Sequence, residues 1–392
     1  MGLSIGKIEL LLLVAAVVAM LARRLHVPYS VGLVVAGIGL TLLPFSLEVG
    51  LTKDLIFTIL LPPLIFEAAF CLHWPELRRD LPLVLVLATL GVAMSASVIA
   101  IGMHFVAAWP WASALLFGVM VAATDPVSVI ATFKEAGVGG RLRLLVEAES
   151  LFNDGAAAVG FVIIAVFAVG NALSPSEMAG TLVLMVGGGI ACGAAVAGAL
   201  LLIAGRTEDS LVELTFTTVA AYGSFLLAEH LHWSGVLATL TAGLMLGNLG
   251  ALGAISNKGR EAVVAFWDYA AFVANSLIFL LIGIHETTQN YSAVWLPALA
   301  AIGLVIIGRA AAIYPISLLF SRSSLRVTMK HQHVLFWGGL RGALALALAL
   351  GLPPEVAFRK DMITVTFAVV VFSLLVQGLT MTPLLRKTGD IS

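Results

Sequence analysis

Residues 114–133 read ALLFGVMVAATDPVSVIATF, an apolar stretch long enough to cross a membrane as a helix. Thr124, Asp125 and Pro126 interrupt it near its centre. Proline lacks the N–H that a helical hydrogen bond needs, and it disfavours helical geometry at the residue before it. The helix is therefore predicted to break at Asp125, which places a carboxylate beside unpaired backbone groups at mid-membrane depth.

A second stretch is interrupted in the same way. Residues 334–350 read VLFWGGLRGALALALAL, in which three glycines surround Arg341. Glycine weakens a helix, so this segment is also predicted to break beside a buried charge. Two interrupted helices in corresponding places of two halves of a chain point to the binding site of a transporter.

The composition places both stretches in an integral membrane protein. Of 392 residues, 60% are hydrophobic and 11% are charged, and the mean hydropathy is +1.08. A soluble domain carries about 25% charged residues. The net charge of −1 provides no basic field for nucleic acid. Cys71 and Cys192 are too few for a disulfide framework or a metal cluster.

Thirteen segments meet the length of a membrane-spanning helix, and none alternates as the strands of a membrane barrel do. They are 7–22, 31–46, 54–72, 82–104, 112–133, 144–169, 178–204, 212–230, 233–250, 262–284, 293–320, 333–351 and 362–385. The sequence thus predicts an all-α polytopic protein whose residues 1–392 form a single transmembrane domain. With 178–204 as a linker helix, 7–169 and 212–385 become two inverted six-helix repeats. The interrupted segments are then the fifth of each repeat, run in opposite directions and cross.

The loops predict the orientation, because cytoplasmic loops are rich in Lys and Arg. With the N-terminus outside, fifteen of the 21 Lys and Arg residues fall in inner loops and four fall outside. The remaining two, Arg309 and Arg341, lie within spans. The bias predicts a multi-pass protein of the cell (inner) membrane with a cytoplasmic C-terminus.

Charges at bilayer depth are costly and are retained mainly for function or pairing. Glu149, Ser150, Asn153 and Asp154 follow the i, i+1, i+4, i+5 positions of one helix, so they share a face. Such an oxygen-rich face suits a hard cation such as Na⁺ and does not suit a thiophilic metal. The other charged residues expected within spans are Glu67, Asp125, Arg309 and Arg341, whereas Asp268 is expected nearer the membrane interface.

Five motifs occur in order along the chain: LPPLIFEA (61–68), ATDPVSV (123–129), ESLFNDG (149–155), FVANSLIFLLIG (272–283) and GLRGALALAL (339–348). Together they resemble the monovalent cation/proton antiporters of the NhaP/NHE-like branch. The resemblance covers essentially the whole transmembrane chain. It implies a thirteen-span inverted-repeat fold, a homodimer in membrane lipid, and an elevator-like exchange of Na⁺ or Li⁺ for H⁺ that needs no cofactor.

The resemblance also implies roles for individual residues. Asp154 matches the ion-binding carboxylate of the family, and Asn153 matches its neighbour in an Asn-Asp pair. Thr124, Ser150 and Glu67 match positions near the ion, so Na⁺ is expected at Asp154, Ser150 and Thr124. Glu149 matches the acid that pairs with an arginine, here Arg309. Because another branch with two aspartates is typically electrogenic, Asn153 implies one-for-one, electroneutral exchange.

The residues themselves predict a compatible mechanism. A carboxylate buried away from water holds either a proton or a cation, and its bare charge is costly to move across an apolar barrier. Exchange follows if the site reorients only when Asp154 is neutralised. Unwound carbonyls near Thr124 are expected to bind the cation, and Asp125 and Arg341 are expected to neutralise the partial charges of the broken helix ends.

Three alternatives remain open from the sequence. A K⁺/H⁺ or broad-cation exchanger would use the same scaffold, since no motif determines cavity size. A passive channel is disfavoured, because channels repeat a selectivity ring by symmetry whereas these polar residues converge on one asymmetric site. An enzyme is disfavoured as well, because neither a HExxH zinc pair nor a GxSxG nucleophile motif occurs.

Overall fold

The two interrupted stretches form pairs of shorter helices. In the computed structural model, which describes residues 5–25, 27–42, 51–170, 174–204, 209–249 and 256–389, helix α6 (Trp111–Ala122) is followed by α7 (Val127–Ala136). Helix α15 (Met329–Trp337) is likewise followed by α16 (Ala343–Leu350). Both predicted breaks are therefore present, each at the residues that disfavour a continuous helix.

The regular structure of the described residues is helical throughout, which confirms the predicted class. The first half contains α1 (Ile5–Leu25), α2 (Tyr29–Leu40), α3 (Leu61–Cys71), α4 (Trp74–Val86), α5 (Val92–Ala107) and α8 (Gly140–Ala168) besides α6 and α7. The remainder contains α9 (Pro175–Ala204), α10 (Ser210–Thr218), α11 (Ser224–His230), α12 (Gly235–Leu249), α13 (Asn257–Glu286), α14 (Trp295–Leu319), α17 (Arg359–Phe372) and α18 (Leu379–Thr388). Short π-helical turns at Leu55–Leu60, Leu87–Gly91, Val219–Gly223 and Ser373–Gly378 continue into their neighbouring helices.

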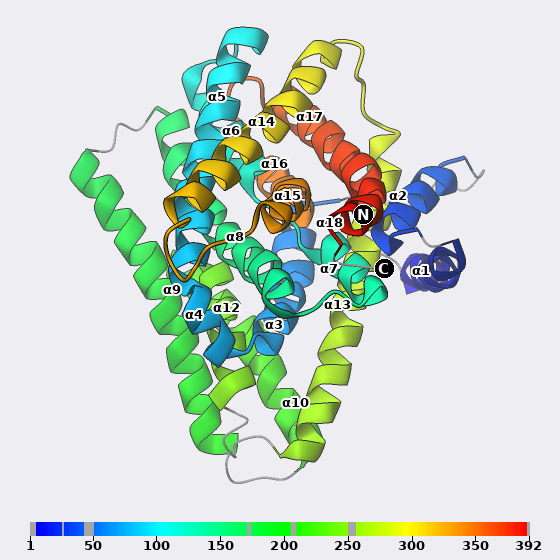
Figure 1. Cartoon of the computed structure of the whole chain (residues 1–392), viewed down its shortest axis with the longest axis vertical. Helices are drawn as coiled ribbons and strands as arrows, with labels where there is room; N and C mark the ends of the chain where they lie inside the picture. Colours follow the sequence, from blue (N-terminus) through cyan, green and yellow to red (C-terminus); the bar gives the residue numbers. More distant parts are fainter. Residues whose placement is uncertain are drawn as a thin grey trace.

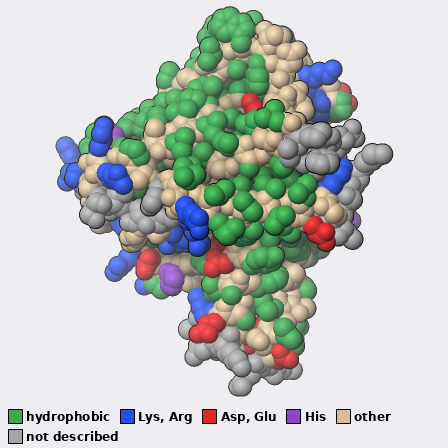
Figure 2. Space-filling view, turned by 90° about the vertical axis from the view of Figure 1, so that its right-hand side faces the viewer, with side chains coloured by type: hydrophobic (Ala, Val, Ile, Leu, Met, Phe, Trp, Pro, Cys, Tyr) green, Lys and Arg blue, Asp and Glu red, His purple; other side chains and the backbone are tan. Residues whose placement is uncertain are grey.

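Seven helices of the described chain are long and apolar enough to cross a membrane, and four shorter apolar helices accompany them. Figure 2 shows hydrophobic side chains over much of one face of the molecule, with most of the visible Lys and Arg toward its left and right margins. This distribution suits a surface in contact with lipid, whose hydrocarbon core offers no partner for charged groups. The number of crossings remains a prediction.

One predicted segment is longer than the helix found there. The apolar pattern predicts a span over 31–46, whereas α2 ends at Leu40 and Thr41 and Leu42 form a turn. Pro44 disfavours helical geometry at the residue before it, which opposes an extension of α2 to position 46. Residues 43–46 lie outside the described part of the chain.

The helices pack in two groups, each built from both halves of the sequence. The first group joins α1, α2, α3 and α9–α13 through extensive α2–α13, α3–α12 and α9–α12 contacts. The second joins α4–α8 with α14–α18, chiefly through α5–α6, α5–α14 and α6–α8 contacts. In Figure 1 the long helices α9 and α13 border the lower half, and α14–α18 lie in the upper half. Contacts between the groups are sparser, and the site described below lies at their boundary.

Close packing of α2 on α13 depends on two glycines. A Cβ atom on Gly37 would lie 2.3 Å from the Leu280 carbonyl oxygen, and one on Gly283 would lie 2.2 Å from the Val34 carbonyl oxygen. No real Cβ contact is this short, so the two backbones touch where both residues lack a side chain. Small residues allow this approach between membrane helices.

We predict that Gly37→Ala lowers the thermal unfolding midpoint in detergent by several degrees. The added methyl group must push α2 away from α13, and overpacking of this kind costs about 1–3 kcal/mol. Gly39→Ala is the matched control, because no atom lies within 4 Å of a Cβ built at that position of the same helix. Equal midpoints for the two variants would contradict the packing described here.

Candidate functional site

The two helix breaks contact each other through the backbone. The Asp125 N–H, in the break between α6 and α7, donates a hydrogen bond of 2.7 Å to the Leu340 carbonyl oxygen in the other break. The Arg341 N–H donates to the Ser373 hydroxyl at 3.0 Å. Backbone groups left unpaired by the interruptions thus find partners within the protein, as the interior of a membrane protein requires.

Arg341 neutralises the carbonyl end of α6. Its side chain is fully buried, and its Nη1 donates to the carbonyl oxygens of Ala122 and Ala123, each at 3.1 Å. The carboxyl end of a helix carries a partial negative charge of about half a unit, which a guanidinium stabilises. The contact expected of Arg341 is therefore present, across the two breaks.

Asp125 occupies the opposite kind of helix end. Its Oδ1 accepts a hydrogen bond of 3.0 Å from the Val127 N–H at the start of α7. Its Oδ2 lies directly against Gly342, the residue before α16, where a Cβ atom would come within 2.1 Å. The carboxylate thus lies beside the amino ends of two helices, where a negative charge is favourable. Only glycine fits at position 342 beside it.

Glu149 and Arg309 form the predicted ion pair. The two Arg309 Nη atoms reach the two Glu149 carboxylate oxygens at 2.7 and 2.9 Å, and both residues are buried. Arg309 also donates to the Leu335 carbonyl oxygen, from Nε at 3.3 Å and from Nη2 at 3.0 Å. Leu335 is near the carboxyl end of α15, so Arg309 neutralises the carbonyl end of that broken helix too. This second contact was not predicted from the sequence.

Asn153 connects the ion pair to the first break. Its Oδ1 accepts from the Thr124 N–H at 3.0 Å, and its Nδ2 donates to the Thr124 hydroxyl at 2.6 Å and to Glu149 Oε1 at 3.2 Å. The Ser150 hydroxyl lies 2.9 Å from the Thr124 hydroxyl. Asn153 and Ser150 are buried, and their polar groups hold Thr124 in place.

A cavity of about 210 Å³ opens beside this network, between the two groups of helices. Thr124, Asp125, Asp154 and Glu67 line it, as does Asp268. Ser150 and Asn153 lie behind its wall. Sequence reasoning did not single out Lys134 and Glu147, which also line it, although Glu147 precedes Asp154 by seven residues and so shares its helix face.

Asp154 differs from the two neighbouring carboxylates, Asp125 and Glu149. Its Oδ1 is buried and has no hydrogen-bond partner among the residues that the structure describes. The charges that act on it are those of Asp125 and Glu149, which are also negative. Each of those two is stabilised elsewhere, by helix ends or by Arg309. Asp154 thus faces the cavity without a fixed counter-charge.

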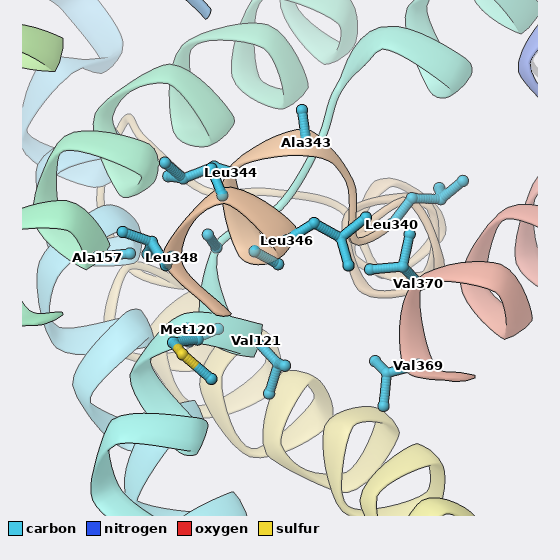
Figure 3. Close-up of a cluster of buried hydrophobic side chains, with 14 of the residues drawn as sticks. Met120, Val121, Ala157, Leu340, Ala343, Leu344, Leu346, Leu348, Val369 and Val370 are labelled. Carbon is cyan, nitrogen blue, oxygen red and sulfur yellow. The ribbon is translucent and has the colours of Figure 1, made fainter. Parts of the chain in front are cut away.

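An apolar cluster closes the other side of the breaks. Figure 3 shows side chains of α6, α16 and α17 packed together, among them Met120, Val121, Leu346 and Val370. Residues 343–349 of α16 are all buried. Tight apolar packing of this kind is unfavourable for the passage of ions.

A model described as the transmembrane region of sodium/hydrogen exchangers matches residues 11–387. The chain belongs to the sodium/hydrogen exchanger family. The predicted resemblance is thereby confirmed, and this exchanger is a multi-pass membrane protein.

Named relatives of this exchanger include bacterial antiporters. The Na⁺/H⁺ antiporter ApNhaP of Aphanothece halophytica is 40% identical over 374 residues, which cover 93% of this chain and 70% of that protein. The Na⁺/H⁺ antiporter NhaH of Halobacillus aidingensis is 34% identical over 407 residues, covering 98% and 97%. Among solved structures, the sodium proton antiporter MjNhaP1 of Methanocaldococcus jannaschii matches with a TM-score of 0.78 at 22% identity, covering 98% of both chains. That match shows a shared fold.

We predict that Glu149→Gln strongly destabilises the protein, by about 3–5 kcal/mol, because it leaves the buried Arg309 guanidinium without its carboxylate. Thermal unfolding in detergent measures the loss. The matched control is Glu147→Gln, two residues earlier on α8, whose partner Arg143 is 3.7 Å away and partly exposed. If Glu147→Gln were the more destabilising change, the structural role assigned to Glu149 would be wrong.

Proposed function

We propose that the protein is a secondary antiporter that exchanges Na⁺ or Li⁺ for H⁺, one for one, with both ions competing for Asp154. One observation carries the proposal: Asp154 lines the cavity with an unpartnered oxygen, whereas the neighbouring carboxylates of Asp125 and Glu149 have fixed partners. A mobile cation or a proton supplies the missing counter-charge. The antiporters related in sequence support Na⁺ as the cation.

The oxygen ligands for the cation come from Asp154 and from the first break. The Thr124 hydroxyl and the unwound backbone around it lie on the cavity wall, and the Ser150 hydroxyl is bound to that of Thr124. Carboxylate, hydroxyl and carbonyl oxygens suit Na⁺ and Li⁺. Within the described residues, no group of three or more His, Cys, Asp or Glu side chains is placed to hold a metal ion, so this site relies on neutral oxygens beside one carboxylate. As in the family that the sequence resembles, we propose that exchange needs no cofactor.

Coupling follows from the cost of a bare charge. We infer that the apolar cluster around α16, which contributes Ala343, Leu344 and Ala345 to the cavity wall, forms the barrier toward the opposite face. An ionised, empty Asp154 would have to pass this barrier unpaired, at a cost of several kcal/mol. Reorientation therefore requires Asp154 to carry either the cation or the proton, which suppresses uncoupled leak.

Alternating access uses the two groups of helices described above. The group α4–α8 and α14–α18 contains the breaks, Asp154 and both buried arginines, and its contacts with the other group are sparse. We infer that this group moves as an elevator against α1–α3 and α9–α13, carrying the site from one face to the other. The assembly is a homodimer in membrane lipid, built from two inverted repeats, 7–169 and 212–385, with 178–204 as linker. It resides in the inner membrane with its N-terminus outside.

Electroneutral exchange follows from Asn153. Asn153 is neutral and its amide is used by Thr124 and Glu149, so α8 contributes one free carboxylate to the ion, not two. One carboxylate holds one Na⁺ or one proton. A K⁺/H⁺ or broad-cation exchanger is the second candidate, since a cavity of about 210 Å³ also accommodates a larger ion.

Flux in proteoliposomes with an imposed pH gradient tests the proposal. A pH-sensitive dye reports proton movement on addition of Na⁺, Li⁺ or K⁺, with and without valinomycin and K⁺ to clamp the voltage. We predict that wild type responds to Na⁺ and Li⁺ regardless of clamping, and that Asp154→Asn falls to the level of protein-free liposomes.

Asp268→Asn is the control, because Asp268 lines the same cavity but is exposed at the surface. It is expected to retain coupled exchange. Normal exchange by Asp154→Asn would refute the site, an effect of clamping on the rate would refute electroneutrality, and an equal response to K⁺ would favour the second candidate.

A further inference from the structure

Four of the helices that line the cavity do so with one face each. The lining residues recur at i, i+3, i+4 and i+7 or a subset of that spacing, which places them on one side of a helix. They include Val127, Ile130, Ala131 and Lys134 of α7; Glu147, Leu151 and Asp154 of α8; Leu61, Leu64, Ile65 and Ala68 of α3; and Asp268, Ala271, Phe272 and Asn275 of α13. The cavity is therefore a shaft that runs along these helices.

The spacing of the lining residues along α7 and α8 gives the length of the shaft. Seven residues span about 10 Å of helix. Asp154 and the break at Thr124 lie at the inner end of the shaft, and Glu147 and Lys134 lie about two turns away, at its mouth. The exposed side chains of Lys134 and Asp268 mark the same opening. This opening faces the side that the loop charges predict to be cytoplasmic.

The charged side chains that line the shaft are all acidic except one. Its lining contains five carboxyl groups, those of Glu67, Asp125, Glu147, Asp154 and Asp268, and one ammonium group, that of Lys134. A mouth of this kind attracts cations. The Lys134 ammonium group carries the same single positive charge as the cation that enters the cavity.

Lys134 acts electrostatically on the carboxylates at the mouth of the cavity, without a direct contact. Its charge acts on Glu67 of α3 and on Glu147 of α8. The ion pairs within 4.0 Å that the described residues form are Arg141–Asp80, Arg143–Glu147 and Arg309–Glu149, so Lys134 is in none of them. The ammonium group is therefore placed as a diffuse counter-charge to the acidic mouth and not as half of a structural pair.

We propose that the positive charge of Lys134, fixed at the mouth of the cavity, competes electrostatically with the transported cation. It lowers the affinity of the cavity for Na⁺ from this face without contacting the binding site. The inference rests on the proposed function. Lys134 belongs to the helix group that carries the site, whereas Glu67 and Asp268 belong to the other group. The mouth that combines Lys134 with Glu67 and Asp268 is therefore formed while the site faces this side, and there the competition weakens the binding of a cytoplasmic Na⁺.

Neutralising Lys134 tests the proposal through the KM for Na⁺. In everted membrane vesicles from an antiporter-deficient bacterial host, at an alkaline pH where protons compete least, Lys134→Met is expected to lower the KM about three- to tenfold. This is the effect of one unit charge about 10 Å away in a medium between protein and water. The maximal rate is expected to stay within about twofold of wild type, because the ligands of the ion are unchanged.

Ionic strength separates this electrostatic role from a structural one. Raising it with choline chloride from about 0.01 M to about 0.15 M shortens the Debye length from about 30 Å to about 8 Å, so the difference in KM should shrink. Lys134→Arg, which keeps the charge, should retain the wild-type KM. Arg78→Met removes an exposed charge of α4 that does not line the cavity, and it should leave the KM unchanged.

Three outcomes overturn the inference: an unchanged KM in Lys134→Met, a KM that falls equally in Arg78→Met, or a difference that does not respond to salt. The first of these outcomes, when it comes with a loss of maximal rate, indicates a structural role for Lys134. The proposed function fails separately, if wild-type vesicles show no Na⁺-dependent proton movement.

Discussion

The contact between two helix breaks is the interaction on which the site depends. A single backbone hydrogen bond, from the Asp125 N–H to the Leu340 carbonyl, joins segments more than 200 residues apart in sequence. It brings four helix ends together within the interior of the protein, where their partial charges have no water to neutralise them. Arg341 and Arg309 meet the carbonyl ends, and Asp125 meets the amino ends. The polar backbone that the breaks expose is thereby stabilised and is available to bind an ion.

The same arrangement explains why one carboxylate is left to titrate against a cation. Glu149 is held by Arg309 and Asn153, and Asn153 in turn holds Thr124 at the break. Within about one turn of α8, Glu149 and Asn153 therefore stabilise the structure, whereas Asp154 is left to bind the ion. Asp154, one residue beyond Asn153, points into the cavity with an unpartnered oxygen. The apolar cluster on the far side then makes the bare charge of Asp154 costly to move, which is the physical basis for obligatory exchange.

Much of this was predictable from the sequence, because the decisive signals are local. Pro126 and the glycines around Arg341 disfavour continuous helix, and a charge buried beside each break is expected to find a helix end. The end of α2 was less predictable, since apolar composition does not mark where a helix stops before Pro44. Contacts that depend on tertiary placement were missed, such as that of Arg309 with Leu335 and the position of Lys134 at the cavity mouth. A single basic residue near a helix end is indistinguishable in sequence from a solvated loop charge, and only the shared face of α7 reveals where it points.

Proton release on cation binding tests the central claim, that Na⁺ and H⁺ compete for one carboxylate, most directly. Purified protein in weakly buffered detergent is titrated with NaCl at a pH where the site is protonated, and the pH change is followed with choline chloride as the blank. The account predicts about one proton released per Na⁺ bound, with no release from Asp154→Asn. Saturable Na⁺ binding without proton release, or equal release from Asp154→Asn, would contradict it.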